Sequence, residues 1–104
     1  MNTRPAQRQM LDAGFRCELC HRRMRDPTTL HHLIPRACHR NQWFQRRFSR
    51  EQMLKTVPLC RDCHSAVHRL IPKEKELGRY YYSIELLLAH AEVKKFVDWV
   101  RRQK

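Results

Sequence analysis

The fold is decided by the stretch LHHLIP, residues 30–35, which is rich in apolar side chains and carries two adjacent histidines. With the two threonines before it, this stretch predicts a β-strand over Thr28–Ile34. Pro35 ends that strand, because proline has no amide hydrogen to donate to a sheet. Residues Thr56–Leu59 predict a brief second strand, which Pro58 confines to a sheet edge or a bend.

Helices are expected around this pair of strands. One begins in the Cys60–Cys63 segment, runs through Leu70 and ends at Pro72. Ser49 and Gln52 form a weak capping box for a short helical piece through Leu54. Two further helices are predicted over Arg4–Ala13 and over Lys73–Leu77, the second ending at Gly78. Ser83 is the predicted N-cap of a last helical segment, whose apolar stripes consist of Leu86, Leu87, Phe96, Val97 and Val100.

The chain of 104 residues fits a single α+β domain. Its motif core spans about 15–70, and a C-terminal helical extension spans about 73–104. A core of this size is thin, so a metal or another cross-link is expected to support it.

The cysteine pattern predicts a structural metal. Four of the five cysteines form two C-x-x-C knuckles, Cys17–Cys20 and Cys60–Cys63, and Cys38 is left to pack as a small hydrophobic group. An odd count without a secretory signal argues against a disulfide framework, whereas four thiolates suit tetrahedral zinc. The alternatives are redox use of one pair, as in thioredoxin-like proteins, or buried thiols. Two knuckles on one short chain favour one structural Zn²⁺ ion.

The charge balance indicates a polyanionic partner. Twenty-two Lys and Arg against ten Asp and Glu give a net charge of +12, which favours nucleic acid over a membrane surface, although a scaffold role would also fit. The two glycines lie far apart, which excludes Gly-rich phosphate loops. No apolar run approaches the ~18 residues of a membrane span, and the N-terminal residues lack a secretory apolar region. We therefore expect a soluble cytosolic protein.

Four histidines stand where metal chemistry would need them. His64 and His68 are an i,i+4 pair, so they face one side of the predicted helix and could chelate one ion. Adjacent helical residues diverge, so Cys63 and His64 point toward different metals. His31 and His32 point to opposite faces of the strand unless it bends there. One could be a ligand and the other a general base, or both could pack against the knuckles.

The ordered combination of these motifs resembles the HNH endonucleases, and within them the small stand-alone bacterial and phage nicking enzymes. The likeness covers about Phe15 to Leu70. It rests on three segments, Cys17-x-x-Cys20, Leu30–Pro35, and Leu59-Cys60-x-x-Cys63-His64 with His68 four positions on. It implies a ββα-metal core in which two antiparallel strands and a helix hold one divalent cation, stapled by the four-cysteine zinc site and extended by N- and C-terminal helices.

The resemblance also implies roles for individual residues. It places the metal ligands on His31, His64 and His68. The general base falls on His32, and the family's middle Asn, which orients the base, falls on Lys55, so Thr56 or Asn41 would have to replace it. The implied reaction is phosphodiester hydrolysis that leaves 5′-phosphate and 3′-hydroxyl ends. Imidazole ligands favour Mn²⁺, Ni²⁺, Co²⁺ or Zn²⁺, and Mg²⁺ is also possible.

The basic stretch between the strands supplies candidate DNA contacts. It contains no acidic residue from Pro27 to Arg50. Guanidinium groups match phosphate geometry, so we expect contacts from Arg36, Arg40, Arg46, Arg47 and Arg50, with Arg36 nearest the scissile phosphate. The near-helical spacing of Trp43, Phe44 and Phe48 favours core packing over base stacking. The cations Lys94, Lys95, Arg101, Arg102 and Lys104 either extend this footprint or form a solvated helix face. His21, His39 and His90 receive no role.

The sequence therefore predicts a monomeric, metal-dependent DNA endonuclease of low specificity that nicks one strand of a duplex, in the cytoplasm of a bacterial or phage-infected cell. The alternative is a zinc-knuckle nucleic-acid-binding module with a degenerate catalytic site. That module needs the cysteines and the basic stretch but no histidine cluster. A nuclease that acts on RNA is a third possibility.

Overall fold

The computed structural model describes residues 16–23 and 30–103. The predicted helix Arg4–Ala13 and the first two residues of the predicted strand lie outside that part of the chain. Within it, two strands, one short 3-10 helix and six α-helices form a small α+β fold. Their order is β1 (Leu30–His32), η1 (Arg36–Cys38), α2 (Gln42–Arg47), α3 (Arg50–Leu54), β2 (Thr56–Pro58), α4 (Arg61–Leu70), α5 (Glu74–Tyr80), α6 (Ile84–Ala89) and α7 (Ala91–Arg101).

The two strands form an antiparallel sheet in which His31 lies opposite Val57 and His32 opposite Thr56. Both predicted strands are present but short, because the chain bends directly after His32. His31 and Val57 are buried, whereas the residues beside them in each strand are less so. One face of the sheet therefore belongs to the core, as the period of two along a strand requires.

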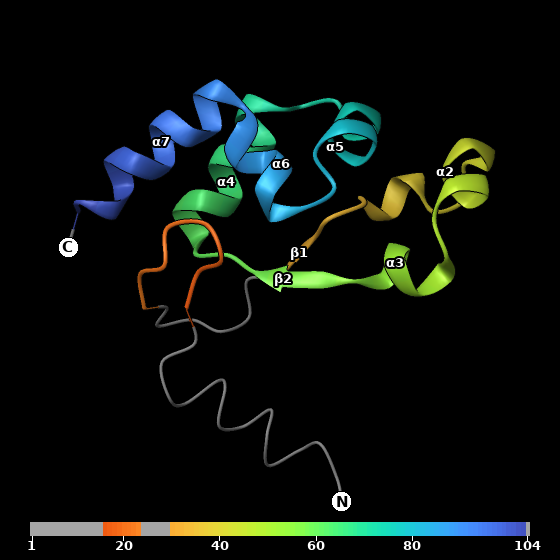
Figure 1. The fold of residues 1–104 in the computed structure, drawn as a ribbon, viewed down its shortest axis with the longest axis horizontal. Coiled ribbons are helices and arrows are strands. Elements are labelled where there is room, and N and C mark those ends of the chain that lie inside the picture. Colours follow the sequence, from red (N-terminus) through yellow and green to blue (C-terminus); the bar gives the residue numbers. More distant parts are fainter. Residues whose placement is uncertain (1–15, 24–29, 104) are drawn as a thin grey trace, which may run out of the picture.

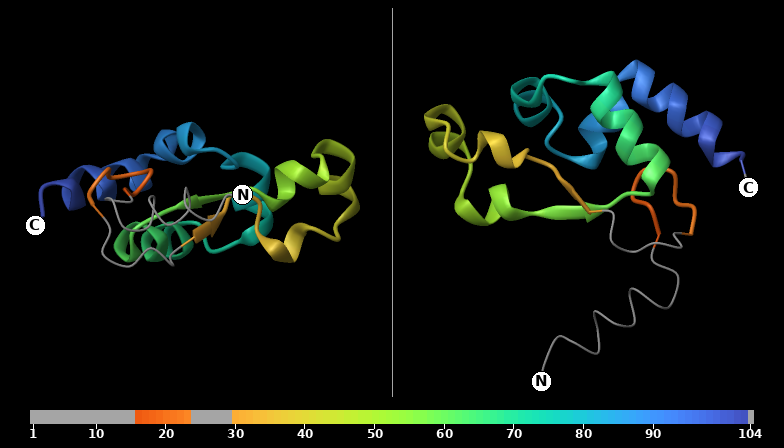
Figure 2. Two further views of the ribbon diagram at one scale, coloured as in Figure 1. Left: turned by 90° about the horizontal axis from the view of Figure 1, so that it is seen from below. Right: turned by 180° about the vertical axis from the view of Figure 1, so that it is seen from behind.

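The helix α4 joins the sheet to the C-terminal helices. It leads away from the end of β2, and α7 packs alongside it (Figure 1). The helix α6 in turn packs on α7. Figure 2 shows α7 at one end of the molecule and the α2–α3 pair at the other, with the sheet between them. Each helix in the described ranges is too short or too polar to cross a lipid bilayer.

The apolar core is divided into two clusters. The larger joins the knuckles, the sheet and the C-terminal helices, and its buried aliphatic residues include Leu33, Leu59, Val67, Ile71, Leu77, Leu87, Val93, Val97 and Val100. The smaller contains Ile34, Cys38, Phe44 and Met53, with Trp43 and Phe48 packed against it. The prediction that the three aromatic side chains pack in a core is confirmed. Cys38 is also buried as predicted, and its thiol donates to the carbonyl oxygen of Glu74 at 3.6 Å.

The basic stretch is more regular than a loop. Residues 36–50 contain η1, α2 and the start of α3. The side chain of Asn41 accepts from the amide of Trp43 at 2.8 Å and begins α2. Ser49 and Gln52 form both hydrogen bonds of the predicted capping box at the start of α3. Local side-chain caps therefore order this arginine-rich segment.

The C-terminal region departs from the prediction at Gly78 and at His90. The helix α5 runs through Gly78 to Tyr80 instead of ending at Leu77. The segment that Ser83 caps is two helices, because the chain is extended at His90 and the ring of His90 accepts from the amide of Val93 at 3.3 Å to begin α7. Apolar periodicity continues across this break, so periodicity alone did not reveal it.

Gly78 lies inside a helix because the chain packs closely against it. A Cβ atom at this position would lie 2.8 Å from Cε1 of Phe44 and 3.2 Å from Cδ of Pro35. The Phe44 ring is fully buried, so it cannot move aside into solvent. The absent side chain thus lets α5 approach η1 and the smaller core cluster.

We expect the substitution Gly78→Ala to destabilise the fold. Alanine improves helix propensity by about 1 kcal/mol, but overpacking a filled core costs about 1–3 kcal/mol. The free energy of unfolding, measured by urea denaturation, should therefore fall. The exposed neighbour Lys75→Ala is the matched control and should leave it nearly unchanged. A Gly78→Ala protein more stable than the wild type would contradict the packing argument.

Candidate metal centres

The first knuckle is a tight turn closed by backbone hydrogen bonds. The amide of His21 donates to the carbonyl of Cys17 at 2.9 Å, and Arg16 and Arg23 form an isolated antiparallel bridge at its base. The backbone of His21 is left-handed, with φ of 64°. The amides of Leu19 and Cys20 both donate to Sγ of Cys17 at 3.4 Å. The turn therefore presents its two sulfurs on one side.

The second knuckle is the beginning of α4. Cys60 is the N-cap residue of this helix, and its Sγ accepts from the amide of Cys63 at 3.4 Å. A helix N-terminus stabilises negative charge, so this position favours the thiolate form of Cys60. Because β2 leads directly into the knuckle, the sheet and α4 together fix the position of its sulfurs.

The four sulfurs of the knuckles form one cluster. The Sγ atoms of Cys17, Cys20, Cys60 and Cys63 all lie within 4.8 Å of one another. The sulfurs of Cys20 and Cys60 are 3.8 Å apart. Zinc–sulfur bonds of about 2.3 Å at tetrahedral angles place sulfurs about 3.8 Å apart. All five cysteines of the chain are free thiols, so this cluster could hold a structural metal ion such as zinc.

The thiols of this cluster compete for negative charge. Hydrogen bonds from Cys17 and Cys63 lower the pKa of Cys60. Hydrogen bonding with Cys60 raises the pKa of Cys17 to about 11. Hydrogen bonding with Cys17 and Cys60 also raises the pKa of Cys63. Four thiolates this close repel one another in the absence of a cation. The residues therefore fit a divalent metal, which would compensate their charge.

Two arginines that the sequence analysis did not identify as knuckle residues surround this cluster. Arg22 donates to Sγ of Cys20 at 3.4 Å and of Cys60 at 3.5 Å, and it pairs with Asp62 at 3.2 Å. Arg101 in α7 donates to the carbonyls of Leu19 and Cys20 at 3.2 and 3.3 Å. Arg22 places positive charge beside the sulfurs, and Arg101 ties the C-terminal helix to the first knuckle.

Three histidines form a second cluster on the other side of α4. His31 comes from β1, and His64 and His68 come from successive turns of the helix. The ring centroids lie 5.0–5.3 Å apart, and one nitrogen of each ring lies within 4.8 Å of the others. The expected convergence of strand and helix imidazoles is thus present. Exposure increases from the buried His31 through His64 to the exposed His68, so the cluster opens to solvent on one side.

His31 is the polar group that most needs a partner. It is fully buried, and its Nε2 atom has no hydrogen-bond partner among the described residues. Burial, followed by the nearby charges of His64 and His68, lowers its pKa to about 3. The ring is therefore neutral at pH 7, as a metal ligand must be. An orphaned buried nitrogen facing two more imidazoles fits a divalent cation, because a metal bond would satisfy it.

The two clusters differ in the chemistry that they allow. Four thiolates complete a tetrahedral zinc site and leave no position for a reactant, whereas three imidazoles leave at least one position open. The helix α4 separates the two, since its first turn carries Cys60 and Cys63 and its side toward β1 carries His64 and His68. Cys63 is fully buried and His64 half-buried, as expected for adjacent residues that point apart.

His32 lies outside the three-histidine cluster. Its strand neighbour His31 faces α4, whereas the His32 ring lies 6.0 Å from the ring of His39. His39 is held by the carbonyl of Ile34 at 2.8 Å. Burial, and then the charges of His39 and Arg36, lower the pKa of His32. His32 is thus neutral near pH 7 and able to accept a proton.

The three residues considered for orienting His32 lie in different environments. Thr56 is its partner across the sheet. Asn41 uses its side-chain oxygen to cap α2. Lys55 is exposed and follows the end of α3. His39, which received no role from the sequence, has the ring that contacts His32. This contact depends on the η1 turn, and no sequence pattern indicates it.

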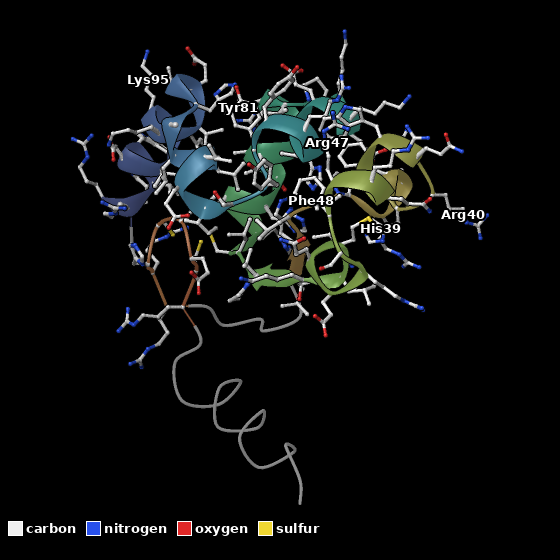
Figure 3. The ribbon with its side chains drawn as sticks, turned by 45° about the vertical axis from the view of Figure 1, so that its right-hand side comes forward. His39, Arg40, Arg47, Phe48, Tyr81 and Lys95 are labelled. Atoms are coloured by element: carbon white, nitrogen blue, oxygen red, sulfur yellow. The ribbon has the colours of Figure 1, made fainter. Side chains whose placement is uncertain are left out.

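The five predicted DNA-contacting arginines are exposed, but one of them is engaged elsewhere. Arg36, Arg40, Arg46 and Arg50 extend from η1, the following turn, α2 and α3, and Figure 3 shows Arg40 pointing away from the body. The Arg47 guanidinium lies 4.1 Å from the centre of the Trp43 ring, and Arg79 of α5 lies 4.2 Å from it. Arg47 therefore has a packing role that the sequence analysis missed.

Comparisons of the chain with protein-family models, with characterised proteins and with solved structures give no match.

We expect removal of the structural metal to destabilise the protein strongly. Stripping zinc with a strong chelator, or substituting Cys63→Ser, should lower the melting temperature by more than about 10 °C, because the free energy of binding a structural metal adds directly to the stability of the folded state. Zinc content measured by atomic absorption should fall in parallel. Cys38→Ser tests a buried thiol outside the cluster and should retain the zinc. Unchanged zinc content in Cys63→Ser would contradict the four-cysteine site.

We expect Arg22→Gln to weaken metal retention at the four-cysteine cluster. The substitution removes the positive charge beside the sulfurs of Cys20 and Cys60, and changes of this kind around a metal typically cost about 10–100-fold in affinity. Transfer of zinc to a chromogenic chelator should therefore be faster. The neighbouring residue provides the matched control, Arg23→Gln, which should behave like the wild type. Equal transfer rates for both variants would show that Arg22 has no such effect.

Proposed function

We propose that this protein is a divalent-metal-dependent DNA endonuclease of the HNH type that nicks one strand of a duplex. The observation that supports it best is the convergence of His31, His64 and His68, together with the orphaned buried nitrogen of His31. A binding module stapled by zinc has no need for this second cluster. A structural metal would also gain nothing from the open, solvent-facing side next to His68.

Each residue of the histidine cluster has a distinct part in this proposal. The buried ring of His31 fixes one ligand position, and the i,i+4 pair of α4 supplies two more from a rigid helix. When bound, a cation such as Mn²⁺, Mg²⁺, Ni²⁺, Co²⁺ or Zn²⁺ would supply Lewis-acid stabilisation of charge on the phosphate oxygens. The exposed side of His68 leaves room for that phosphate.

His32 is the general base of the proposed reaction. It lies next to a ligand residue in the chain, it is neutral near pH 7, and the ring of His39 packs against it. It would take a proton from the water that attacks phosphorus. The nearby Arg36 is exposed at the start of η1 and would bind the phosphate through its guanidinium.

The basic surface supports nucleic acid as the substrate. The chain carries a net charge of +12. Four exposed arginines, Arg36, Arg40, Arg46 and Arg50, extend from the ordered segment between the two strands. Phosphate contacts of this kind provide affinity and position without reading base sequence. Low sequence selectivity is therefore part of the proposal.

The proposal predicts metal-dependent nicking that needs His32. Wild-type protein with added Mn²⁺ should convert supercoiled plasmid to the open-circular form on an agarose gel. His32→Ala should be slower by about 10²–10⁴-fold, the usual effect of removing a general base, while it still shifts the plasmid. His21→Gly is the control, because it removes an exposed histidine at a left-handed position that glycine tolerates.

Two results would contradict this function. Wild-type protein that binds plasmid but leaves it supercoiled with each of the five cations would favour the zinc-knuckle binding module. A His32→Ala protein as active as the wild type would exclude His32 as the base. A single-stranded RNA substrate, tested beside the plasmid, distinguishes a nuclease that acts on RNA.

A further inference from the structure

An exposed aromatic groove lies between α4 and α7, next to the histidine cluster but not part of it. Its volume is 360 Å³, and its walls are formed by Arg69, Leu70, Glu92, Lys95, Phe96 and Trp99. Trp99 is 55% exposed, which is unusual for the largest side chain in a protein of this size. Its ring lies 5.8 Å from that of Phe96 at an angle of 47°. Two aromatic rings thus line this surface, and Trp99 is the more exposed of the two.

Positive charge flanks these rings. The guanidinium of Arg69 lies 5.6 Å from the centre of the Phe96 ring. Lys95 is exposed, and Figure 3 shows it extending from the outer side of α7. Glu92 is the acidic residue of the groove walls. The neighbouring Lys94 is paired with Asp98 at 3.2 Å. The groove therefore combines flat apolar faces with two cations at its rim.

The groove and His68 share the C-terminal half of α4. Arg69 directly follows His68, the exposed member of the histidine cluster, in the last turns of α4. A rise of about 1.5 Å per residue in a helix keeps these two residues within one turn of each other. Because adjacent helical residues diverge by about 100°, Arg69 and His68 face different ways, and the groove is a second surface beside the histidine cluster.

We propose that this groove binds single-stranded nucleic acid, with one unpaired base stacked on Trp99 and Phe96 and phosphates paired with Arg69 and Lys95. Bases can stack on aromatic side chains only when they are unpaired, and every base offers a face for this contact. The proposal rests on nucleic acid being the substrate, but it does not require catalysis. It predicts tighter binding of a frayed, gapped or single-stranded nucleic acid than of an intact duplex.

Trp43 is covered by arginines whereas Trp99 is exposed, so fluorescence of Trp99 can report on the groove. Arg47 and Arg79 pack on Trp43 at 4.1 and 4.2 Å from its ring centre, so this ring has little free surface for a base. These are the two tryptophans of the chain. The substitution Trp43→Phe therefore leaves Trp99 as the single fluorescent tryptophan.

The first test is fluorescence of the zinc-loaded Trp43→Phe protein without added divalent cation. Titration with an oligothymidylate of about twelve nucleotides should quench Trp99 and saturate, since single-strand site sizes are of this order. An oligouridylate distinguishes an RNA preference from a DNA preference. A self-complementary duplex of equal length should quench less. No quenching by either single strand would overturn the proposal, whether or not the wild type nicks plasmid.

The second test compares affinities for the labelled oligothymidylate by fluorescence anisotropy. Trp99→Leu should weaken binding by about tenfold or more. The matched control is Tyr80→Leu, which removes another exposed aromatic ring outside the groove and should change nothing. Replacing both Arg69 and Lys95 by Gln should lower the slope of log affinity against log salt by about 1.4. Equal affinities of Trp99→Leu and the wild type for the oligonucleotide would overturn the proposal. It would also be overturned if sedimentation showed that Trp99 is needed for a dimer but not for oligonucleotide binding.

Discussion

Four cysteine sulfurs converge at one point and bring together segments that are distant in the sequence. The two knuckles are forty residues apart in the sequence, yet the sulfurs of Cys20 and Cys60 lie 3.8 Å apart. Close thiolates are tolerated where a cation compensates them. This cluster fixes the start of α4, and α7 is tied to it through the hydrogen bonds of Arg101. The larger apolar cluster joins the same elements, since Cys17, Cys20 and Cys63 belong to it.

The helix α4 contributes side chains to both clusters that could hold a metal ion. Its first turn completes the sulfur cluster, while His64 and His68 meet His31 on the side toward the sheet. Because adjacent helical residues diverge by about 100°, the closed site and the open site remain distinct. The rigidity that the sulfur cluster gives to α4 also orients the imidazoles. In the proposed enzyme, the structural ion would therefore act on catalysis through the helix and not through direct contact.

The arginine-rich end of the molecule has its own packing. The close approach at Gly78 lets α5 lie against Phe44, and the Trp43 ring is covered by one arginine from α2 and one from α5. Local caps at Asn41 and Ser49 order the same region. In the proposed enzyme, the ordered backbone beneath the exposed arginines would reduce the entropy lost on binding a polyanion. The groove at Trp99 lies at the opposite end, beyond α4.

Spacing and local backbone chemistry were enough to predict the two knuckles, the strand before Pro35, the helix that carries Cys63 and His64, and the packing of Phe44. The remaining features depend on contacts between separate segments. Arg22 and Arg101 make contacts that depend on how the first knuckle meets α4 and α7. The contact between the rings of His32 and His39 depends on the turn after β1. The helix α5 continues through Gly78 because it approaches Phe44 closely. Periodicity reports which side of an element is apolar, but it carries no information about the partner on the other side.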